Sequence, residues 1–351
     1  MSSVVITGAS GALGRRVVSR LAETGAWSVV AIDAQPFPAG VAKPRHFTAH
    51  RVNIANAPLD RLIAGADAII HLATTGAEGP GVVEADVEVL HRTLGAGEVN
   101  GVLQVILLSS AAVYGAWPDN PVPMSETAAL RPNPTFQYAV QKRALEARAG
   151  QWRARGSDRK LAVLRPATTL GHPDSRPWLA GAVSPNIAER ITTTLPATQF
   201  VHVDDLADAI VHALECRLDG PFNVASHDWL TSDAAHALFG PSLGFPIPER
   251  LEAPLRALAE RLSKRRPPGA TDYVWWPWVV AVDRLVATGW SAKSSSAEAF
   301  VASKPPSVFA RLYARRRQEV NLAAVTIGSA AVLSVLTAAL RWWRNRYLRR
   351  S

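Results

Sequence analysis

The amino-acid sequence predicts an α/β protein: a doubly wound parallel sheet, with a smaller lobe and an apolar C-terminal helix added to it. Three observations predict this architecture: a glycine-rich turn directly after the first apolar run, an alternation of short apolar runs with helical patterns, and an uncharged stretch near the C-terminus. The chain has 351 residues, which is more than one average domain needs, so a large core with a second lobe is expected.

Residues 1–170 alternate strand-like and helix-like segments. After an apolar run at residues 4–7, further strand-like runs fall at residues 28–32, 46–52, 68–72, 105–108 and 161–164. Helical patterns begin near Ala12, Pro58, Gly81 and Phe136. Near-continuous apolar strands separated by helices are typical of a parallel sheet that is covered on both faces. We therefore expect residues 1–170, with a returning segment at about residues 199–215, to form one domain around such a sheet.

Residues 171–300 have a different composition. Pro, Thr and Trp are frequent there and the apolar runs are short, as at residues 199–205 and 221–225. This predicts a smaller lobe over the carboxyl edge of the sheet, where ligands of open α/β sheets bind. We expect four tryptophans to be core or membrane-facing residues, with the lining of an apolar pocket as the alternative: Trp275, Trp276, Trp278 and Trp290.

The C-terminal segment predicts a membrane anchor. Residues 321–340 contain no charged residue and are flanked by arginines and by Trp342 and Trp343. About 20 residues at about 1.5 Å each span about 30 Å, the hydrocarbon thickness of a bilayer. We expect a basic linker at residues 301–319, a single transmembrane helix at residues 320–343 and a basic tail at residues 344–351; an amphipathic or buried helix is the alternative. Because no signal peptide precedes the first strand, the N-terminal domain is expected in the cytoplasm.

Composition excludes several classes of protein. Apolar types make up 48% of the residues and charged types 19%, which excludes a disordered, highly charged chain. The single cysteine, Cys216, excludes an internal disulfide framework and a multi-cysteine zinc site, and we expect no metal. The formal net charge is +9, but much of the positive charge flanks the expected membrane helix, so we expect no nucleic-acid partner.

The glycine-rich turn predicts a dinucleotide site. Residues 7–14 read Thr-Gly-Ala-Ser-Gly-Ala-Leu-Gly, directly after the first strand and at the start of a helix. Glycine permits the sharp turn and the close approach to a pyrophosphate, and the helix N-terminus then faces the phosphates. An acidic residue at the end of the second strand binds ribose hydroxyls and repels a 2′-phosphate, so NAD is favoured over NADP, although Arg15 and Arg16 could argue for the phosphate. The expected contacts in this Rossmann-type, NAD-binding domain are Gly8, Ser10, Gly11, Ala12, Leu13, Gly14 and Asp33.

Further motifs give a more specific resemblance. They are Ile-His-Leu-Ala at residues 70–73, Leu-Ser-Ser-Ala-Ala-Val-Tyr-Gly at residues 108–115, Tyr138 with Lys142, Leu-Arg-Pro-Ala at residues 164–167 and Phe-Val-His-Val-Asp-Asp-Leu-Ala at residues 200–207. With the glycine loop, they resemble the extended short-chain dehydrogenase/reductases, and within these the NAD-dependent epimerase/dehydratase family typified by UDP-sugar epimerases. The resemblance covers roughly residues 1–300 and implies that residues 171–300 bind the substrate.

Ser110, Tyr138 and Lys142 are the expected catalytic residues. Tyr138 and Lys142 lie four residues apart, which on a helix places a phenol and an ammonium group on one face. The ammonium group of Lys142, together with the positive nicotinamide of NAD⁺, is expected to lower the pKa of the phenol from about 10, so that Tyr138 can act as a base. Ser110 follows the strand at residues 105–108 and can hydrogen-bond the reacting oxygen of the substrate; Ser109 is the competitor for this role.

The resemblance also implies further cofactor contacts, from Asn53, Ile54, Leu72, Ala73, Ser109, Pro166 and Ala167, besides Tyr138 and Lys142 themselves. The sequence departs from the family at three positions: Asn53 replaces an acidic residue, Asp86 matches a family Asn, and Gln141 replaces the usual Ser between the Tyr and the Lys. Four other groups are expected to be structural. They are Tyr114 as a packed aromatic, His71 and His202 as hydrogen-bonding residues, and Asp204 with Asp205 as a helix cap rather than a metal pair.

Together these features predict a membrane-anchored NAD-dependent oxidoreductase or epimerase that acts on a nucleotide sugar or a lipid-linked sugar by reversible hydride transfer. One alternative is a hydroxysteroid-type alcohol dehydrogenase. Its site would not need cations such as Arg165, Arg176 or Arg190, which a nucleotide-sugar site should offer to a diphosphate. Another is a non-catalytic NAD-binding sensor or scaffold, whose usual sign would be a damaged Tyr/Lys pair. A homodimer could form through the helix expected at residues 136–155.

Overall fold

The computed structural model describes residues 2–74, 81–171, 196–239 and 267–303. The chain divides into two compact units, Met1–Ser303 and Lys304–Ser351, and all described residues belong to the first. The predicted transmembrane helix at residues 320–343, the basic tail at residues 344–351 and nearly all of the predicted linker lie outside the described residues. Within the described ranges, no helix combines the length and the apolar character needed to cross a bilayer.

Seven parallel strands form the main sheet, in the order β3-β2-β1-β4-β5-β6-β9. Their bounds are Ser2–Thr7 (β1), Trp27–Asp33 (β2), Phe47–Arg51 (β3), Ala68–His71 (β4), Gln104–Leu108 (β5), Lys160–Pro166 (β6) and Gly220–Val224 (β9). Successive strands are added on opposite sides of β1, so the strand order reverses between β1 and β4. Ligands of open α/β sheets bind at the carboxyl ends of the strands at such a reversal. The doubly wound parallel sheet predicted from the sequence is confirmed.

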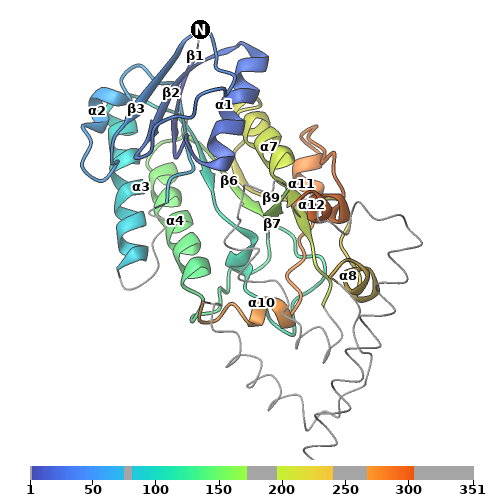
Figure 1. Ribbon diagram of the computed structural model, residues 1–351. Coiled ribbons are helices and arrows are strands. Elements are labelled where there is room, and N and C mark those ends of the chain that lie inside the picture. The colour runs from blue at the N-terminus through green and yellow to red at the C-terminus, as the bar shows by residue number, and fades with distance from the viewer. Residues whose placement is uncertain (1, 75–80, 172–195, 240–266, 304–351) are drawn as a thin grey trace, which may run out of the picture. The chain divides into compact units, whose positions relative to one another are not determined.

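Helices cover both faces of the sheet (Figure 1). α3 (Val82–Val99) and α4 (Gln137–Ala154) pack side by side on one face, next to the short α2 (Leu59–Leu62). α1 (Ala12–Thr24) and α7 (Val203–Glu215) pack together on the other face. The helix starts predicted near Ala12, Pro58, Gly81 and Phe136 agree with these bounds to within one residue.

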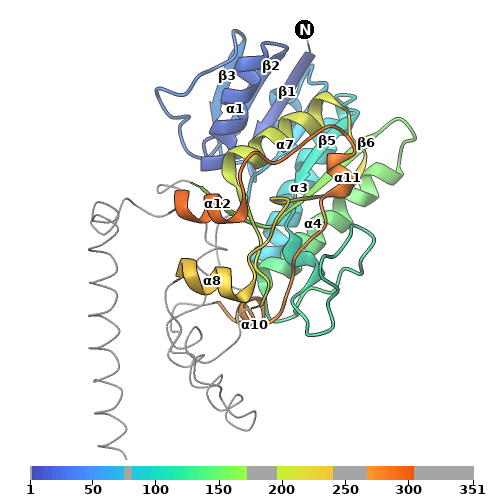
Figure 2. The same ribbon diagram turned by 90° about the vertical axis from the view of Figure 1, so that its right-hand side faces the viewer.

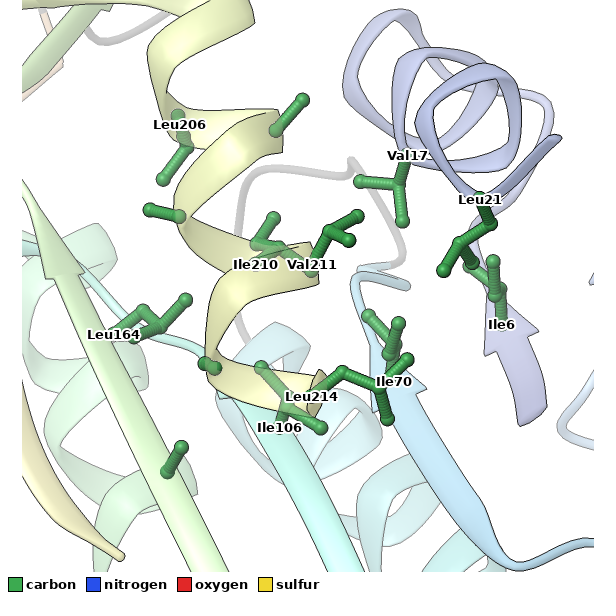
Figure 3. Packing of buried hydrophobic residues seen from close by; sticks show 14 of the residues in the cluster. Ile6, Val17, Leu21, Ile70, Ile106, Leu164, Leu206, Ile210, Val211 and Leu214 are labelled. Atoms are coloured by element: carbon green, nitrogen blue, oxygen red, sulfur yellow. The ribbon is translucent and has the colours of Figure 1, made fainter. Parts of the chain in front are cut away.

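The core under α1 and α7 consists of aliphatic side chains (Figure 3). Leu206, Ile210 and Leu214 recur every four residues along α7, which places them on one face of the helix. They point toward the strand residues Ile106 and Leu164, and all five side chains are buried. This face of the sheet therefore packs against a buried apolar layer.

The smaller lobe is bounded differently from the sequence prediction. β9 lies within residues 171–300 but joins the main sheet beside β6, because Phe222 and Val224 are buried in the main core. Pro221 is tolerated there because β9 is an edge strand. Besides the main sheet and the elements already described, the described residues form a two-stranded parallel sheet, Thr168–Leu170 (β7) with Phe200–His202 (β8). They also form four short helices (Figure 2): Ser232–Phe239 (α8), Asp272–Trp275 (α10), Asp283–Val286 (α11) and Ser296–Ala302 (α12).

Candidate active site

The loop between β1 and α1 accepts only glycine at two positions. Gly8 has a φ of 74°, in the left-handed region, and a Cβ atom there would lie 2.8 Å from the backbone nitrogen of Ala73. A Cβ atom at Gly14 would lie 2.3 Å from the carbonyl oxygen of Gly8, because α1 begins directly against the loop. The glycines thus allow β1, α1 and the residues after β4 to meet backbone to backbone, which is the geometry of a dinucleotide-binding turn.

The N-terminus of α1 fits the pyrophosphate of NAD. Gly11 is the N-cap residue and provides no side-chain cap. A Cβ atom at Gly11 would meet nothing closer than the Gly8 carbonyl oxygen at 3.4 Å, so there is room above the first turn. The first turn of α1 consists of Ala12, Leu13 and Gly14. The N–H groups of this turn have no acceptor within the helix and lie at the positive end of the helix dipole. Such an uncapped turn is suited to bind an anion.

Asp33 ends β2 beside this loop. Its Oδ2 accepts a hydrogen bond from the backbone N–H of Ser10 at 2.9 Å, and its Oδ1 accepts one from the N–H of Gln35 at 2.8 Å. A carboxylate oxygen can accept two hydrogen bonds, so Asp33 retains acceptor lone pairs for ribose hydroxyls. Arg16, which could have argued for a 2′-phosphate, instead donates from Nε to Asp204 at 2.9 Å. The residues present therefore fit NAD.

Ser110, Tyr138 and Lys142 come together at the carboxyl end of β5. Ser110 begins the 3-10 helix Ala111–Tyr114 (η1), and its hydroxyl hydrogen-bonds the side chain of Tyr138. Lys142, one helical turn after Tyr138 on α4, is only 4% exposed. Its Nζ donates to the carbonyl of Leu108 at 3.1 Å and lies 5.8 Å from the centroid of the Tyr138 ring. The three predicted catalytic residues thus form one cluster.

The pKa of Tyr138 differs from the sequence expectation. Burial raises this pKa above its ordinary value, and the hydrogen bond from Ser110 acts in the opposite direction. Activation of Tyr138 as a base therefore requires positive charge near the phenol oxygen that outweighs the effect of burial.

Burial and two nearby carboxylates act in opposite directions on the pKa of Lys142. Burial lowers its pKa to about 8, and the charges of Asp86 and Glu146 act against this lowering. His71, at the end of β4, is neutral, because burial and then the nearby Lys142 lower its pKa to about 3. The Nδ1 of His71 lies 3.0 Å from Oγ1 of Thr7, which is the structural role expected of it. At neutral pH the cluster thus holds one cation, Lys142, beside a neutral imidazole.

The other predicted cofactor residues lie around the carboxyl edge, and three of them form hydrogen bonds within the protein. Leu72 and Ala73 lie against Gly8, and Ile54 and Pro166 are buried. The side chain of Asn53 accepts from the N–H of Ala55 at 3.0 Å and so closes its own turn. Ala167 and Ser109 also form hydrogen bonds within the protein. The backbone N–H of Ala167 donates to the Val224 carbonyl at 2.9 Å, and the Oγ of Ser109 donates to Glu146 at 2.5 Å. The hydroxyl proton of Ser109 is therefore used within the protein, and the contact of Ser109 with the cofactor stays a prediction.

Arg165 is not available for a diphosphate, which corrects the sequence suggestion. Its guanidinium Nη2 lies 2.7 Å from Oε2 of Glu146, and both residues are buried. Sequence reasoning missed this pair, although an acidic residue one helical turn after Lys142, on the same face of α4, was a signal for it. Arg176 and Arg190 lie outside the described residues.

The remaining singled-out residues are structural. His202 caps α7 with its side chain, while Asp205, at the start of that helix, accepts the N–H groups of Lys293 and Ser294 at 3.1 and 3.0 Å. Among the described residues no group of three His, Cys, Asp or Glu side chains is placed to hold a metal ion. Tyr114 is fully buried, as expected of a packed aromatic. Of the four tryptophans, Trp290 is in the main core and Trp276 and Trp278 pack against the cluster of Phe136 and Tyr273.

The parallel sheet, the glycine turn and the Ser–Tyr–Lys cluster define a dinucleotide-binding protein of the short-chain dehydrogenase/reductase class. The sequence model of the NAD dependent epimerase/dehydratase family matches residues 4–225, which is more than half of the chain, so the chain belongs to this family of enzymes. The family is NAD dependent, which confirms NAD as the cofactor. No curated protein sequence matches the chain significantly.

Solved structures share the fold at low sequence identity. MoeE5 in complex with UDP-glucose and NAD is 22% identical with a TM-score of 0.62, and the match covers 86% of this chain and 97% of that one. A UDP-glucose-4-epimerase from Stenotrophomonas maltophila, solved with NAD and formylated UDP-arabinopyranose, is 18% identical with a TM-score of 0.61 and the same coverage. A UDP-N-acetylglucosamine 4-epimerase from Methanobrevibacter ruminantium M1 is 19% identical, with a TM-score of 0.61 and again the same coverage. The UDP-sugar epimerase resemblance stated from the sequence is thereby confirmed for the fold.

Proposed function

We propose that the protein interconverts or oxidises a UDP-sugar through reversible hydride transfer, with Tyr138 as the acid–base group. The observation that carries the proposal is the joining of Ser110, Tyr138 and Lys142 in one cluster at the carboxyl edge of the sheet that bears the glycine turn. The substrate class is supported by structures of the same fold that hold UDP-glucose or formylated UDP-arabinopyranose together with NAD.

In this proposal each protein group has one task. The hydroxyl of Ser110 and the ionised phenol oxygen of Tyr138 bind the reacting sugar hydroxyl, and Tyr138 takes its proton and becomes a neutral phenol as the alcohol becomes a carbonyl. NAD, which the glycine turn and Asp33 would hold, would supply the acceptor and donor of the hydride. Lys142 stays protonated and stabilises the negative charge on the phenol oxygen. When the carbonyl is reduced again, Tyr138 returns the proton, and the face on which the hydride arrives decides between epimer and original sugar.

The product mixture tests this proposal. The full chain with NAD is incubated with a panel of UDP-sugars, and products are separated as epimer, dehydrated sugar or oxidised sugar. We expect one of these products from at least one UDP-sugar, and loss of the product with Tyr138→Phe while NAD remains bound. A panel of sterol alcohols runs in parallel: turnover of sterols alone would replace the sugar assignment by the hydroxysteroid dehydrogenase alternative, and NAD binding without any turnover would favour a sensor or scaffold.

Membrane anchoring belongs to the proposal as well, with the N-terminal domain in the cytoplasm. It is supported by the uncharged residues 321–340 between arginine clusters. We expect the full chain to stay with membranes after alkaline extraction and Val332→Arg, in the middle of this stretch, to release it; Ala302→Arg, at an exposed position of α12, serves as the control. Release of the unaltered chain would contradict the anchor. An anchored enzyme would also meet lipid-linked sugars, so equal rates on soluble and lipid-linked forms would speak against a lipid-linked substrate.

A homodimer through α4 completes the proposal. Arg143, Ala147 and Gly150 are exposed on one side of this helix, and the small side chains at two of these positions allow a second helix to approach closely. Light scattering of the full chain in detergent should give the mass of two chains, and Ala147→Arg should halve it. A single-chain mass for the unaltered protein would contradict the dimer.

A further inference from the structure

A buried carboxylate stands directly behind the Ser–Tyr–Lys cluster. Glu146 lies one helical turn after Lys142 on the same face of α4, and it is 7% exposed. Its Oε1 accepts hydrogen bonds from Ser109 Oγ at 2.5 Å and from Arg165 Nε at 3.0 Å, and its Oε2 accepts one from Arg165 Nη2 at 2.7 Å. Three bonds of this kind, two of them from a guanidinium group, hold an ionised carboxylate in one place.

The bonds of Glu146 join the elements that carry the catalytic residues. Ser109 immediately precedes Ser110, so the 2.5 Å bond ties the end of β5 to α4. Arg165 lies on β6, so its pair with Glu146 links this strand to α4, and its Nη1 donates to the hydroxyl of Tyr114 at 2.8 Å. Tyr114 in turn donates to Asn223 on β9 at 2.8 Å. One connected set of buried polar groups therefore spans α4 and the carboxyl ends of β5, β6 and β9.

We propose that Glu146 is a positioning residue for the reaction, which fixes Ser110 through Ser109 and fixes Lys142 through its charge and its place on α4. This inference rests on the proposed function, because the residues that it positions are the proposed catalytic ones. Loss of the Ser109 bond removes the direct side-chain link between the β5 end and α4, so the distance between the Ser110 hydroxyl and Tyr138 is held less closely. Loss of the negative charge removes one of the two carboxylates that keep Lys142 protonated despite its burial.

The charged and titratable groups that face Lys142 are Asp86 from α3, Glu146 and Tyr138 from α4, and His71 from β4. His71 is neutral throughout the working pH range because its pKa is lowered to about 3. Removing the charge of Glu146 disfavours the ammonium form, so Lys142 would lose its proton at a lower pH. The rate, which needs the ammonium group, would then fall at a lower pH on the alkaline side.

Four variants of the full chain separate geometry from charge. With a UDP-sugar that the unaltered protein converts, Glu146→Gln should lower kcat about tenfold or more and move the alkaline limb of the kcat profile down by about one pH unit. Glu146→Asp keeps the charge but shortens the side chain, so kcat should fall while the alkaline limb stays in place. Ser109→Ala removes the hydrogen bond between Ser109 and Glu146 but keeps the charge of Glu146, so kcat should fall several-fold, again with an unmoved limb.

Asp219→Asn is the matched control. Asp219 forms an ion pair at 2.8 Å with Arg153, which lies on α4 like Glu146. Arg153 is three helical turns beyond Lys142, and the pair contacts neither Ser109 nor Lys142. It should leave kcat and its pH profile unchanged. The inference is overturned if folded Glu146→Gln keeps the kcat and the alkaline limb of the unaltered protein, or if Asp219→Asn reproduces its changes. If Glu146→Gln does not fold, unchanged kcat in Glu146→Asp and Ser109→Ala overturns it.

A second readout needs no turnover. We compare the free energy of unfolding of the unaltered chain with that of Lys142→Met as a function of pH. The pH at which the difference between the two begins to change reports the pKa of Lys142 in the folded protein. This pH should fall by about one unit when the comparison is repeated in the Glu146→Gln background. If the unaltered protein converts no UDP-sugar, the proposed function fails on that result alone, while an unmoved pKa of Lys142 in this comparison overturns the role of Glu146 independently.

Discussion

The side-chain amide of Gln141 donates a hydrogen bond to the carboxylate of Asp86, across the contact between α4 and α3. Both side chains are buried, and both positions depart from the wording of the epimerase/dehydratase resemblance, which has Ser and Asn there. The two departures are therefore partners in one interaction. The negative charge of Asp86 also favours the protonated form of Lys142, so the Asp86–Gln141 pair lies next to the catalytic residues of the candidate active site.

A double-mutant cycle on Asp86 and Gln141 measures this partnership. We expect Asp86→Ala and Gln141→Ala to be non-additive in the free energy of unfolding, with a coupling of about 1 kcal/mol or more, because each single variant leaves a buried polar group without its partner. Denaturant unfolding of the four proteins provides the values. Gln104→Ala is the control partner for Asp86→Ala: its side chain bonds the carbonyls of Ala213 and Leu214, so the two changes should add within about 0.5 kcal/mol.

Gly14→Ala should abolish NAD binding and destabilise the fold. The added methyl group would lie 2.3 Å from the Gly8 carbonyl, so α1 or the loop must move, at a cost of about 1–3 kcal/mol. Gly95→Ala, in α3, is a matched change because its methyl group meets nothing within 4 Å. It should stabilise the protein by about 0.4–1 kcal/mol and leave NAD affinity unchanged. Calorimetric titration with NAD and thermal unfolding test both variants, and retained affinity in Gly14→Ala would disprove the assigned phosphate turn.

Asp33→Asn should weaken NAD binding and reduce the preference for NAD over NADP. The amide keeps an acceptor for the N–H of Ser10 but loses the charge that strengthens bonds to ribose hydroxyls, so affinity for NAD should fall about tenfold or more. The same loss removes the repulsion of a 2′-phosphate, so affinity for NADP should rise or stay constant. Titration with both cofactors decides, and equal losses for NAD and NADP would place the ribose elsewhere.

Stability should rise with pH in the window in which buried Lys142 loses its proton. The pKa of this lysine is about 8 in the folded protein and 10.5 in an ordinary setting, so between these values the unfolded chain binds more protons. Raising the pH in this window therefore favours the folded state, by on the order of 3 kcal/mol in total relative to Lys142→Met. Below about pH 8 the difference between the two proteins should be flat. A difference that stays flat through the whole window would show that Lys142 is not buried.

The regular parts of this protein could be predicted from its sequence because they depend on local patterns. Near-continuous apolar runs mark strands that are buried on both faces, and Pro58, Gly81 and the glycine turn mark helix starts. β9 was assigned to the wrong lobe because its pairing with β6 is set by burial of Phe222 and Val224 in a core assembled from distant segments. Spacing within the sequence carries no information about such a pairing.

The candidate site shows the same division. The positions of Ser110, Tyr138 and Lys142 follow from a strand end and a helical spacing of four residues, both of which are visible in the sequence. The partners of Ser109, Arg165 and Asp86 come from other elements, so the sequence left Arg165 free for a substrate although it is paired with Glu146. The raised pKa of Tyr138 also depends on tertiary burial, which a motif does not report.

The most direct test of the account follows the absorbance of reduced nicotinamide after the full chain, loaded with NAD, is mixed with a UDP-sugar. We expect an absorbance change in a single turnover by the unaltered protein, and its loss in Tyr138→Phe with NAD still bound at the same affinity. A Tyr138→Phe protein that reduces NAD as fast as the unaltered one would contradict the assignment of the Ser110–Tyr138–Lys142 cluster as the site of hydride transfer.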